Sequence, residues 1–593
     1  GKALAIPVYK VLSAKQDGYR PRLGSERMIF SRMIGRDTEL EMLEQYVRKV
    51  VNGTGAIVNI IGEAGIGKSR LLDELYKCEA VKKVMLLEGK AVSMGRNLSF
   101  HPIIDLLKQW TRISPNDNGA TAFKKLEDTI ASLFQDKVGE VLPSVATLMG
   151  IKLPESYGER IKGIEGEALE KLILKNMRDL LISANELSPL MIVIEDLHWA
   201  DKSSIELLGS LFRLAETQRI LFINLLRPGD KETGDRIVET TRENLPQHYV
   251  EIALRPLDER MSESLITNML NISGVHHALI RRIVRRAGGN PYFVEEVVRS
   301  LVDEEAVVLR NGKFEVTEKI STVAIPITIN DVLMARIDRL EVQARNLVKL
   351  ASVIGRSFFY RVLSEVASTV QNIDDRLSYL KEIELFQERR RMEELEYLFK
   401  HALAQEAAYD SILPQKRKQL HLKVAGSIEK VFGEKLHEFY GMLAYHFSRG
   451  ENPDKAEEYL LKAGAEALKS SASNEALYYY EEALTLYLKK NPDVADPAKV
   501  AMLEKNIAIA LYNRGQYVEA VDYFDKALNY YWGKLPKHPI SILVTFSNAF
   551  LHFLLTLYLP SIKFRKIPTQ NDTESINLFY KKIKALSVTD PKR

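Results

Sequence analysis

Cysteine is nearly absent from this chain of 593 residues, where Cys78 is the single example. One thiol excludes an intrachain disulfide framework and a metal centre built from several thiolates. Its scarcity also fits a reducing compartment, so we predict a cytoplasmic location. A basic stretch followed by an apolar stretch is missing from the first residues, so no secretory signal is predicted. Because the sequence begins with Gly1 instead of methionine, we expect a fragment of a longer protein.

The chain also lacks an excess of charge of either sign. Its 83 Lys and Arg residues oppose 79 Asp and Glu residues, which gives a formal net charge of +4. The basic residues are scattered, whereas a nucleic-acid-binding protein usually carries a basic patch, so no DNA partner is expected. A length of 593 residues exceeds what one hydrophobic core supports, and several domains are therefore predicted.

A glycine-rich motif, GEAGIGKS at 62–69, lies between an apolar run and an amphipathic segment. A glycine-rich turn between a buried strand and a helix lets backbone N–H groups surround phosphate oxygens at the positive end of the helix. Lys68 is placed to reach the β- and γ-phosphates, and the Ser69 hydroxyl to ligate Mg²⁺. The residues expected to bind the nucleotide here are Gly62, Gly65, Gly67, Lys68, Ser69 and Arg70.

A second apolar run, 190–194, is too short for a helix and ends in Glu195 and Asp196. It predicts a buried parallel strand whose carboxylates lie beside the phosphate loop. One acid would hold Mg²⁺ through water and the other would polarise the attacking water, so both are candidate metal ligands and catalytic residues.

Two further signals follow the acidic strand. Ser203 and Glu206 form a capping-box pattern that predicts the start of a helix. The run 219–226 predicts another buried strand, and Arg227 directly after it is a candidate catalytic contact to the γ-phosphate. A solvated loop charge is the alternative interpretation of Arg227.

The order and spacing of several motifs resemble the signal-transduction ATPases with numerous domains, the STAND ATPases. The motifs are IGRD at 34–37 with Glu39, EDLHWAD at 195–201, Arg227-Pro228 and GGNPYFVEE at 288–296. The resemblance implies that Gly35 and Arg36 lie near the adenine, that Arg227 is the first sensor, and that Pro291 packs on the base. Glu195 stands where Asp is usual and Leu225 where Thr is frequent, so slow hydrolysis is expected.

More narrowly, the combination is similar to the ATPase module that follows the catalytic domain of class III adenylyl/guanylyl cyclases of the soluble adenylyl cyclase kind. Residues 1–12 resemble the last strand of such a cyclase domain, although a generic exposed strand explains them almost as well. Residues 13–25 are polar and contain Gly18, Pro21 and Gly24, which predicts a linker. The metal-binding aspartates of a cyclase are absent, so cyclase activity would require an upstream domain of the same chain.

The next two segments are predicted to be a helical lid and a winged-helix domain. Helical spacing over 258–305 is broken by GGNP at 288–291, as expected for a lid. Helices around 332–340 and 344–353, with short strands near 384–388 and 394–399, are typical of a winged helix. The triple arginine at 389–391 suggests DNA binding, but Glu393, Glu394 and Glu396 dilute its charge. By the resemblance His401 senses the β-phosphate, whereas an ordinary core or surface histidine is the alternative.

Small and aromatic residues recur at helical offsets from Leu420 onward, which fits tetratricopeptide-like helix pairs that bind partner proteins. A helical bundle with no ligand is the alternative. The recurring sets are Gly515, Tyr517, Ala520, Phe524 and Ala527; Ala476, Tyr480 and Ala483; and Ala456, Leu460 and Ala463.

The segment 540–559 carries no charge and is about as long as a membrane-spanning helix. Polar residues every three or four positions draw a stripe along it, which favours packing in the helical core or at a protein interface. The alternative is attachment to a membrane, with contact over 540–566, where Lys563, Arg565 and Lys566 follow the apolar run.

The sequence therefore predicts a multidomain chain: an α/β P-loop NTPase core, a helical lid, a winged-helix domain and an all-α solenoid of tetratricopeptide-like repeats. The predicted boundaries are 1–27 for the cyclase-like end and linker, 28–256, 257–324, 325–415 and 416–593. The predicted function is a regulatory switch that uses ATP, ADP and Mg²⁺. A nucleotide-braced scaffold for partner proteins and a transcription regulator are the alternatives.

Overall fold

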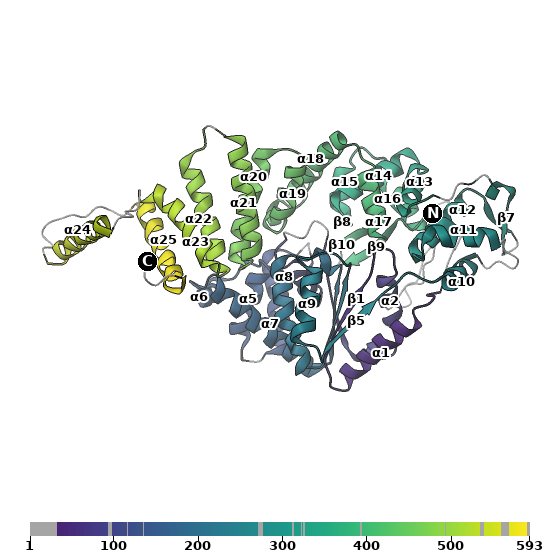
Figure 1. Ribbon diagram of the computed structural model, residues 1–593, viewed down its shortest axis with the longest axis horizontal. Coiled ribbons are helices and arrows are strands. Elements are labelled where there is room, and N and C mark those ends of the chain that lie inside the picture. The colour runs from purple at the N-terminus through teal and green to yellow at the C-terminus, as the bar shows by residue number, and fades with distance from the viewer. Residues whose placement is uncertain are drawn as a thin grey trace, which may run out of the picture.

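The computed structural model of the chain describes residues 32–589, apart from 93–97, 115–116, 135, 271–276, 311–312, 322, 324–325, 392–393, 493, 534–538 and 559–568. Both predictions for the N-terminal segment, the cyclase-like strand at 1–12 and the linker at 13–25, lie outside the described residues. Figure 1 shows a mixed α/β part with helices continuing from it in one arc.

A parallel sheet of five strands forms the centre of the first part, in the order β2-β3-β4-β1-β5. The strands are β1 (Ala56–Ile61), β2 (Met85–Lys90), β3 (Leu190–Glu195), β4 (Ile220–Leu226) and β5 (Tyr249–Ala253). The inner strands are mostly apolar and almost fully buried because helices cover both faces of a parallel sheet. The buried asparagines of β1 and β4 pair with each other, and Asn224 donates to the Asn59 side chain at 2.8 Å. The two apolar runs expected to be buried strands are confirmed as β3 and β4.

The two faces of the sheet belong to separate apolar clusters. On one face Val58 and Ile60 pack with α1 (Asp37–Val51) and α2 (Lys68–Leu75). On the other face Ile57 and Phe222 belong to the cluster that includes the long helices after β2. Those helices are α3 (His101–Trp110), α4 (Gly119–Leu133), α5 (Val138–Leu148), α6 (Glu155–Ile161), α7 (Glu167–Leu187), α8 (Lys202–Leu211) and α9 (Gly234–Asn244).

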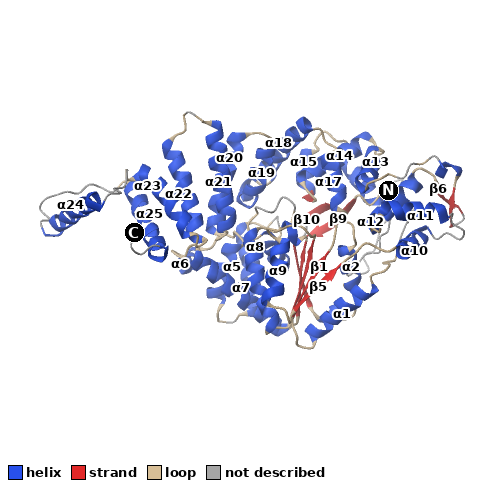
Figure 2. Cartoon of the chain, viewed as in Figure 1, coloured by secondary structure: helices blue, strands red, loops and turns tan. Residues whose placement is uncertain are grey.

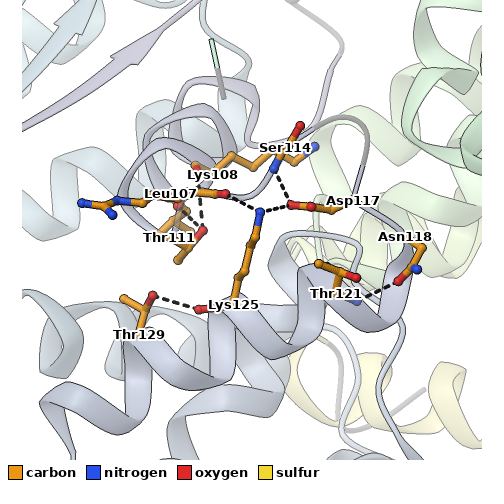
Figure 3. Close-up of polar contacts among 10 residues, drawn as sticks. Leu107, Lys108, Thr111, Ser114, Asp117, Asn118, Thr121, Lys125 and Thr129 are labelled. Atoms are coloured by element: carbon orange, nitrogen blue, oxygen red, sulfur yellow. Dashed lines mark hydrogen bonds and ion pairs between the residues drawn. The ribbon is translucent and has the colours of Figure 1, made fainter. Parts of the chain in front are cut away.

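The connection between α3 and α4 is fixed by one carboxylate. Asp117 accepts hydrogen bonds of 2.6 Å from the backbone N–H of Ser114 and from the Lys125 ammonium, as Figure 3 shows. Asn118 then caps α4 by accepting from the N–H of Thr121 at 2.8 Å. These contacts hold the C-terminal end of α3, a helix that borders the cavity described below.

The capping box predicted from Ser203 and Glu206 is wrong. Asp201 is the N-cap residue of α8, and its carboxylate accepts from both the N–H and the hydroxyl of Ser204. A carboxylate is the stronger acceptor at this positive helix end. Ser203 instead donates its hydroxyl to Glu475, 2.6 Å away and 272 residues later in the chain.

The described residues of 259–321 contain three α-helices, a β-hairpin and a short 3-10 helix, Glu318–Ser321. The elements are α10 (Glu259–Leu270), α11 (His277–Ala287), α12 (Pro291–Asp303), β6 (Val307–Arg310) and β7 (Lys313–Val316). They have an apolar cluster of their own, which includes Ile283 and Val297. The predicted helical segment is present, but the β6–β7 hairpin was not foreseen.

Residues 326–410 contain five helices around a small antiparallel sheet in the order β8-β10-β9. The elements are α13 (Ile329–Asp338), α14 (Val342–Ile354), β8 (Ser357–Phe359), α15 (Tyr360–Val366), α16 (Ile373–Glu382), β9 (Phe386–Arg391), β10 (Glu394–Phe399) and α17 (Ala402–Asp410). The strand predicted at 384–388 begins later, because Glu384 has a left-handed backbone with φ of 61°. The triple arginine therefore belongs to β9 itself.

Successive helices form the rest of the described chain, and in Figure 1 they run from above the sheet to the left-hand end of the molecule. They are α18 (Pro414–Val431), α19 (Tyr440–Arg449), α20 (Pro453–Lys469), α21 (Ser473–Lys490), α22 (Pro497–Asn513), α23 (Tyr517–Tyr531), α24 (Pro539–Tyr558) and α25 (Gln570–Thr589). A Cβ atom on Gly464 would lie 2.8 Å from the Tyr480 ring, so α20 and α21 touch directly. The alanine sets of α20 and α21 therefore lie on two consecutive helices that pack against each other.

Helix α24 stands apart from the other helices of this region in Figure 2. Its apolar side chains Leu543, Val544, Phe546 and Phe550 are each at least half exposed. Packing in a helical core, one of the interpretations of this segment, is therefore wrong for these side chains. Among the described residues, no helix is both long and apolar enough to cross a membrane.

Candidate nucleotide site

The phosphate loop connects the end of β1 to the first residue of α2. Gly65 and Gly67 have positive φ angles of 79° and 105°, which side-chain-bearing residues adopt only with strain. Gly62 is needed for another reason, because a Cβ atom there would lie 2.7 Å from Ile66. The predicted turn between strand and helix is present, and its three glycines each meet a steric requirement.

Lys68 is the first residue of α2, and its side chain is buried under the loop. Its ammonium donates to the carbonyl oxygens of Gly62 and Glu63 at 2.5 and 3.0 Å. Burial, followed by the nearby charge of Arg227, lowers the pKa of Lys68 to about 8. Ser69 is exposed at the next position, and Arg70 pairs with Glu74 along α2 at 3.3 Å.

The acidic pair ends β3. Burial would raise the pKa of Asp196, but the positive charges of Arg356 and Lys90 outweigh it and lower that pKa. Arg356 forms an ion pair with the Asp196 carboxylate. The Lys90 ammonium, at the end of β2, lies 3.9 Å from Glu195 Oε2, and burial lowers the pKa of Lys90. Two carboxylates and two buried cations thus adjoin the phosphate loop.

Arg227 follows β4 and reaches into the same region. Its guanidinium lies over the Trp199 ring, 5.1 Å from the ring centre, and its Nη1 is 3.3 Å from Glu406 Oε1. Glu406 belongs to α17, so this contact joins the sheet to residues 326–410. The alternative of a solvated loop charge does not describe Arg227, which is packed and paired.

His198 lies between these groups and lacks charge at neutral pH. Burial lowers its pKa to about 4, and its ring is 4.7 Å from that of Trp199. Its two ring nitrogens are buried and have no hydrogen-bond partner in the described part of the chain. The imidazole therefore contributes packing to the site and no positive charge.

The start of α12 touches the phosphate loop. The Asn290 side chain donates to the Ala64 carbonyl at 3.0 Å, and the N–H of Tyr292 reaches the Gly65 carbonyl at 3.3 Å. Pro291 is the first residue of α12 between these two contacts. The Tyr292 ring stacks on His401 with the ring centres 3.7 Å apart. The phosphate loop therefore contacts the start of α12, and α12 in turn contacts the start of α17.

Gly35 and Arg36 precede α1. The Arg36 guanidinium donates to the Arg255 carbonyl at 2.5 Å and pairs with Glu39 at 3.1 Å. A Cβ atom on Gly35 would lie 2.5 Å from the sulfur of Met261. These contacts bind the start of α1 to the connection between β5 and α10, and the adenine contact remains a prediction.

The structure brings together most of the residues chosen from the sequence. The parallel register places the ends of β1, β3 and β4 at one sheet edge, which joins the loop to Glu195, Asp196 and Arg227. Sequence reasoning missed five residues around them: Lys90, Asn290, Tyr292, Arg356 and Glu406. Asn290 lies in the GGNP motif and so had a local signal, whereas Lys90, which follows Glu88 and Gly89 after the apolar run 84–87, had a weak one and Arg356 and Glu406 had none.

Two family models match parts of the chain. The AAA ATPase domain matches residues 32–223, a range that includes the phosphate loop and both acids. A domain of unknown function (DUF8739) matches residues 258–315, which cover α10 to β6. The chain therefore carries an AAA-type ATPase domain of the P-loop kind, followed by a mostly helical region.

Similar proteins were found among curated sequences and solved structures. The chain is 27% identical over 470 residues to the uncharacterized protein R02095 of Rhizobium meliloti (strain 1021). This alignment covers 77% of the chain and 42% of the relative, so the chain spans less than half of the relative's length.

Two solved structures are similar to the chain, with TM-scores below 0.5. One is the STAND protein with a tetratricopeptide repeat sensor, PH0952, from Pyrococcus horikoshii, at 13% identity and a TM-score of 0.39 over 95% of this chain and 82% of that one. The other is the Aeropyrum pernix ORC1 protein in complex with DNA, at 12% identity and a TM-score of 0.29 over 65% and 95%.

Proposed function

We propose that this chain is an ATP-binding switch that hydrolyses ATP slowly and changes the arrangement of its parts with the bound nucleotide. The supporting observation is that catalytic candidates of the ATPase domain are paired with residues of 326–410. Arg356 pairs with Asp196, and Glu406 pairs with Arg227. A change in charge at the nucleotide would therefore alter ion pairs that residues 326–410 make with the ATPase domain.

The residues of the loop suit a triphosphate. Backbone N–H groups at the start of α2 and the Lys68 ammonium supply positive charge. Lys68 would exchange its carbonyl partners for phosphate oxygens, a stronger charge-assisted contact. Gly35, Arg36 and Pro291 are proposed to border the adenine, and His401 the β-phosphate.

The oxygen donors Ser69, Glu195 and Asp196 fit Mg²⁺, which prefers hard oxygen ligands and keeps several waters. Asp196 is ionised before the metal binds, because the charges of Arg356 and Lys90 lower its pKa, and the charge of Mg²⁺ would keep it ionised once Arg356 releases it. Bound Mg²⁺ would neutralise charge on the phosphates. Glu195 is proposed to orient the attacking water, with Arg227 against the γ-phosphate.

The switch then follows from competition for two side chains. Asp196 cannot serve Mg²⁺ fully while Arg356 holds it, and Arg227 cannot reach a γ-phosphate while Glu406 holds it. Moving a balance of two states from 1:99 to 99:1 needs about 5.5 kcal/mol of differential binding, and the γ-phosphate contacts are the proposed source. ADP lacks those contacts and would favour the closed arrangement, by which we mean the one in which Arg356 holds Asp196 and Glu406 holds Arg227.

The test is nucleotide binding and turnover on the purified chain, compared with Lys68→Ala and with the double variant Glu195→Gln/Asp196→Asn. Slow hydrolysis that is lost in both variants is expected. Lys82→Ala is the matched control, because Lys82 is an exposed lysine outside the loop. Retained ADP without turnover would instead favour the scaffold, and no bound nucleotide at all would overturn the proposal.

The finer part of the proposal concerns what the switch controls. We propose that the helical region binds partner proteins and that an upstream cyclase domain precedes residues 1–12. The greater length of the Rhizobium relative is consistent with further domains in such proteins. The full-length protein should then carry paired metal-binding aspartates and form a cyclic nucleotide. If no cyclic nucleotide forms in an assay with Mn²⁺, the cyclase link is refuted.

A further inference from the structure

A cavity of about 300 Å³ lies where three parts of the chain meet, and none of its lining residues belongs to the phosphate loop. Its walls come from α3, from the sheet formed by β8, β9 and β10, and from the helices α18 to α21. The volume is that of a small-ligand site. The apolar wall includes Ile104, Phe358, Phe359, Phe432, Met442 and Ala467.

Two cations on this wall also contact the acidic pair of the ATPase domain. Arg356 and Lys90 both line the cavity, and they approach Asp196 and Glu195 respectively. Within the described part of the chain, Arg356 Nε is buried and makes no hydrogen bond. An unused buried donor beside an apolar cavity costs free energy that an anionic ligand would recover.

The acids on the wall are already engaged. Glu438 accepts from Lys108 at 2.6 Å, Glu466 from Lys469 at 2.9 Å, and Asp105 from the backbone N–H of Lys90 at 3.1 Å. Glu396, the remaining wall carboxylate, has contacts of its own. Arg356 and Lys90 are paired too, but Arg356 keeps a buried N–H at Nε without a hydrogen bond in the described part of the chain. The donor available to a ligand is therefore cationic, and it lies beside an apolar wall.

We propose that this cavity binds a small amphipathic carboxylate, with its apolar body against the phenylalanine rings and its carboxylate on Arg356 and Lys90. A guanidinium carries five N–H donors, so Arg356 can hold the ligand and Asp196 in turn or together. The ligand's charge weakens the hold of Arg356 on Asp196. The ligand then frees Asp196 for Mg²⁺ and raises ATP turnover, an effect that rests on the proposed function.

The binding experiment uses the intact chain without nucleotide and decanoate as the probe, measured by calorimetry. Wild type is expected to bind, Arg356→Gln to bind at least tenfold more weakly, and Ala467→Phe, which fills the cavity, not to bind. Decanamide, which lacks the charge, should bind about as weakly to wild type as decanoate does to Arg356→Gln. Arg376→Gln is the matched control, because Arg376 pairs with Glu341 and does not line the cavity.

A second measurement does not depend on the folding of any variant. A decanoate derivative with a photoreactive diazirine is cross-linked to wild type, and the labelled peptides are identified by mass spectrometry. Labels are expected on β8, which contains Phe358 and Phe359, and on the end of α18, which Phe432 follows. No labelling there, labelling confined to α24, or equal affinity of wild type and Arg356→Gln would each overturn the proposal.

The two proposals fail separately. Lys68→Ala should bind decanoate as wild type does, even though it has lost ATP binding. If wild type binds decanoate but not ATP, the switch is refuted and the carboxylate site stands. If ATP is hydrolysed and decanoate binds without changing turnover, the coupling of the cavity to Asp196 is refuted.

Discussion

Arg356 forms an ion pair with Asp196 across 160 residues of sequence, and it joins residues 326–410 to the acidic end of β3. Only 10% of the Arg356 side chain and 12% of the Asp196 side chain are exposed, so the pair is little screened by solvent. Removing one member would leave an uncompensated buried charge. The contact therefore stabilises the closed arrangement and restrains the carboxylate that the proposed function assigns to Mg²⁺.

Replacing Arg356 by glutamine should have two opposite effects. The variant should lose about 3–5 kcal/mol of unfolding free energy without ligand, because Asp196 keeps a buried charge. With Mg²⁺ and ATP present, most of this loss should be recovered, because the metal replaces the arginine. Calorimetric melts with and without Mg²⁺-ATP measure both effects.

The control for this variant is Arg376→Gln, which removes a more exposed ion pair with Glu341. Exposed pairs contribute about 0–1 kcal/mol, so its melting temperature should change little. Equal losses in the two variants, or no recovery of Arg356→Gln by Mg²⁺-ATP, would contradict the proposed competition for Asp196.

ATP affinity should fall as pH rises above 8, because the proposed phosphate contact needs a charged Lys68. The pKa of Lys68 is lowered to about 8 in the folded chain, so part of the ammonium is neutral just above that pH. A bound triphosphate favours the charged form, and binding then takes up a proton. Between pH 7 and pH 9 the Kd for ATP should rise about tenfold.

The control is Lys68→Arg, whose guanidinium stays charged from pH 7 to pH 9, so this part of the pH dependence should vanish. The same shift has a consequence for stability. The unfolded chain binds more protons than the folded chain between pH 8 and 10.5, so the contribution of Lys68 to stability rises with pH there. An ATP affinity that is flat from pH 7 to pH 9 would contradict the assigned role.

The sequence predicted the centre of the site because each of its signals is local. A glycine-rich loop, a strand ending in acids and an arginine after a strand each have a fixed place in a parallel sheet. AAA-type ATPase identity over residues 32–223 agrees with that prediction. The cap of α8 was mistaken because two acceptors, Asp201 and Ser203, were adjacent and only tertiary contacts decide between them.

The contacts between distant parts could not be predicted. Arg356 follows a glycine at the end of α14, and Glu406 is one of many acids on helices, so neither has a distinctive pattern. Their partners become visible only when residues 326–410 lie against the sheet. The exposure of α24 could not be predicted either. An uncharged 20-residue helix has the same sequence pattern whether it lies in a core, at an interface or on a membrane.

The buried carboxyls Asp201 and Glu475 should make stability depend on pH. Burial, then the charge of Asp201, raises the pKa of Glu475 to about 8, and burial raises the pKa of Asp201 to about 6. Both folded values exceed the ordinary ones, so this contribution to stability is full at acid pH and is lost as pH rises toward 8. The melting temperature should therefore fall between pH 5 and pH 8.

Glu475→Gln tests this assignment. The neutral amide keeps an acceptor for Ser203 and cannot ionise, so the variant should melt higher than wild type at pH 8 and show a flatter pH profile. Glu482→Gln, an exposed change on the same helix, should leave the profile unchanged. A variant as pH-dependent as wild type would show that another group causes the slope.

The triple variant Leu543→Ser/Phe546→Ser/Phe550→Ser should fold as stably as wild type. These side chains are more than half exposed, so their removal costs little buried apolar area, whereas a core site would lose about 2–5 kcal/mol for each large side chain. The melting temperature of the variant, compared with that of wild type, measures this effect.

Two further experiments separate the remaining interpretations of α24, which are a membrane surface and a protein interface. They are sedimentation with vesicles of anionic lipid and sedimentation velocity of the free protein. Wild type that pellets with vesicles while the variant stays in solution indicates a membrane surface, and self-association lost in the variant indicates a protein interface. A large drop in melting temperature would instead place α24 in a packed core.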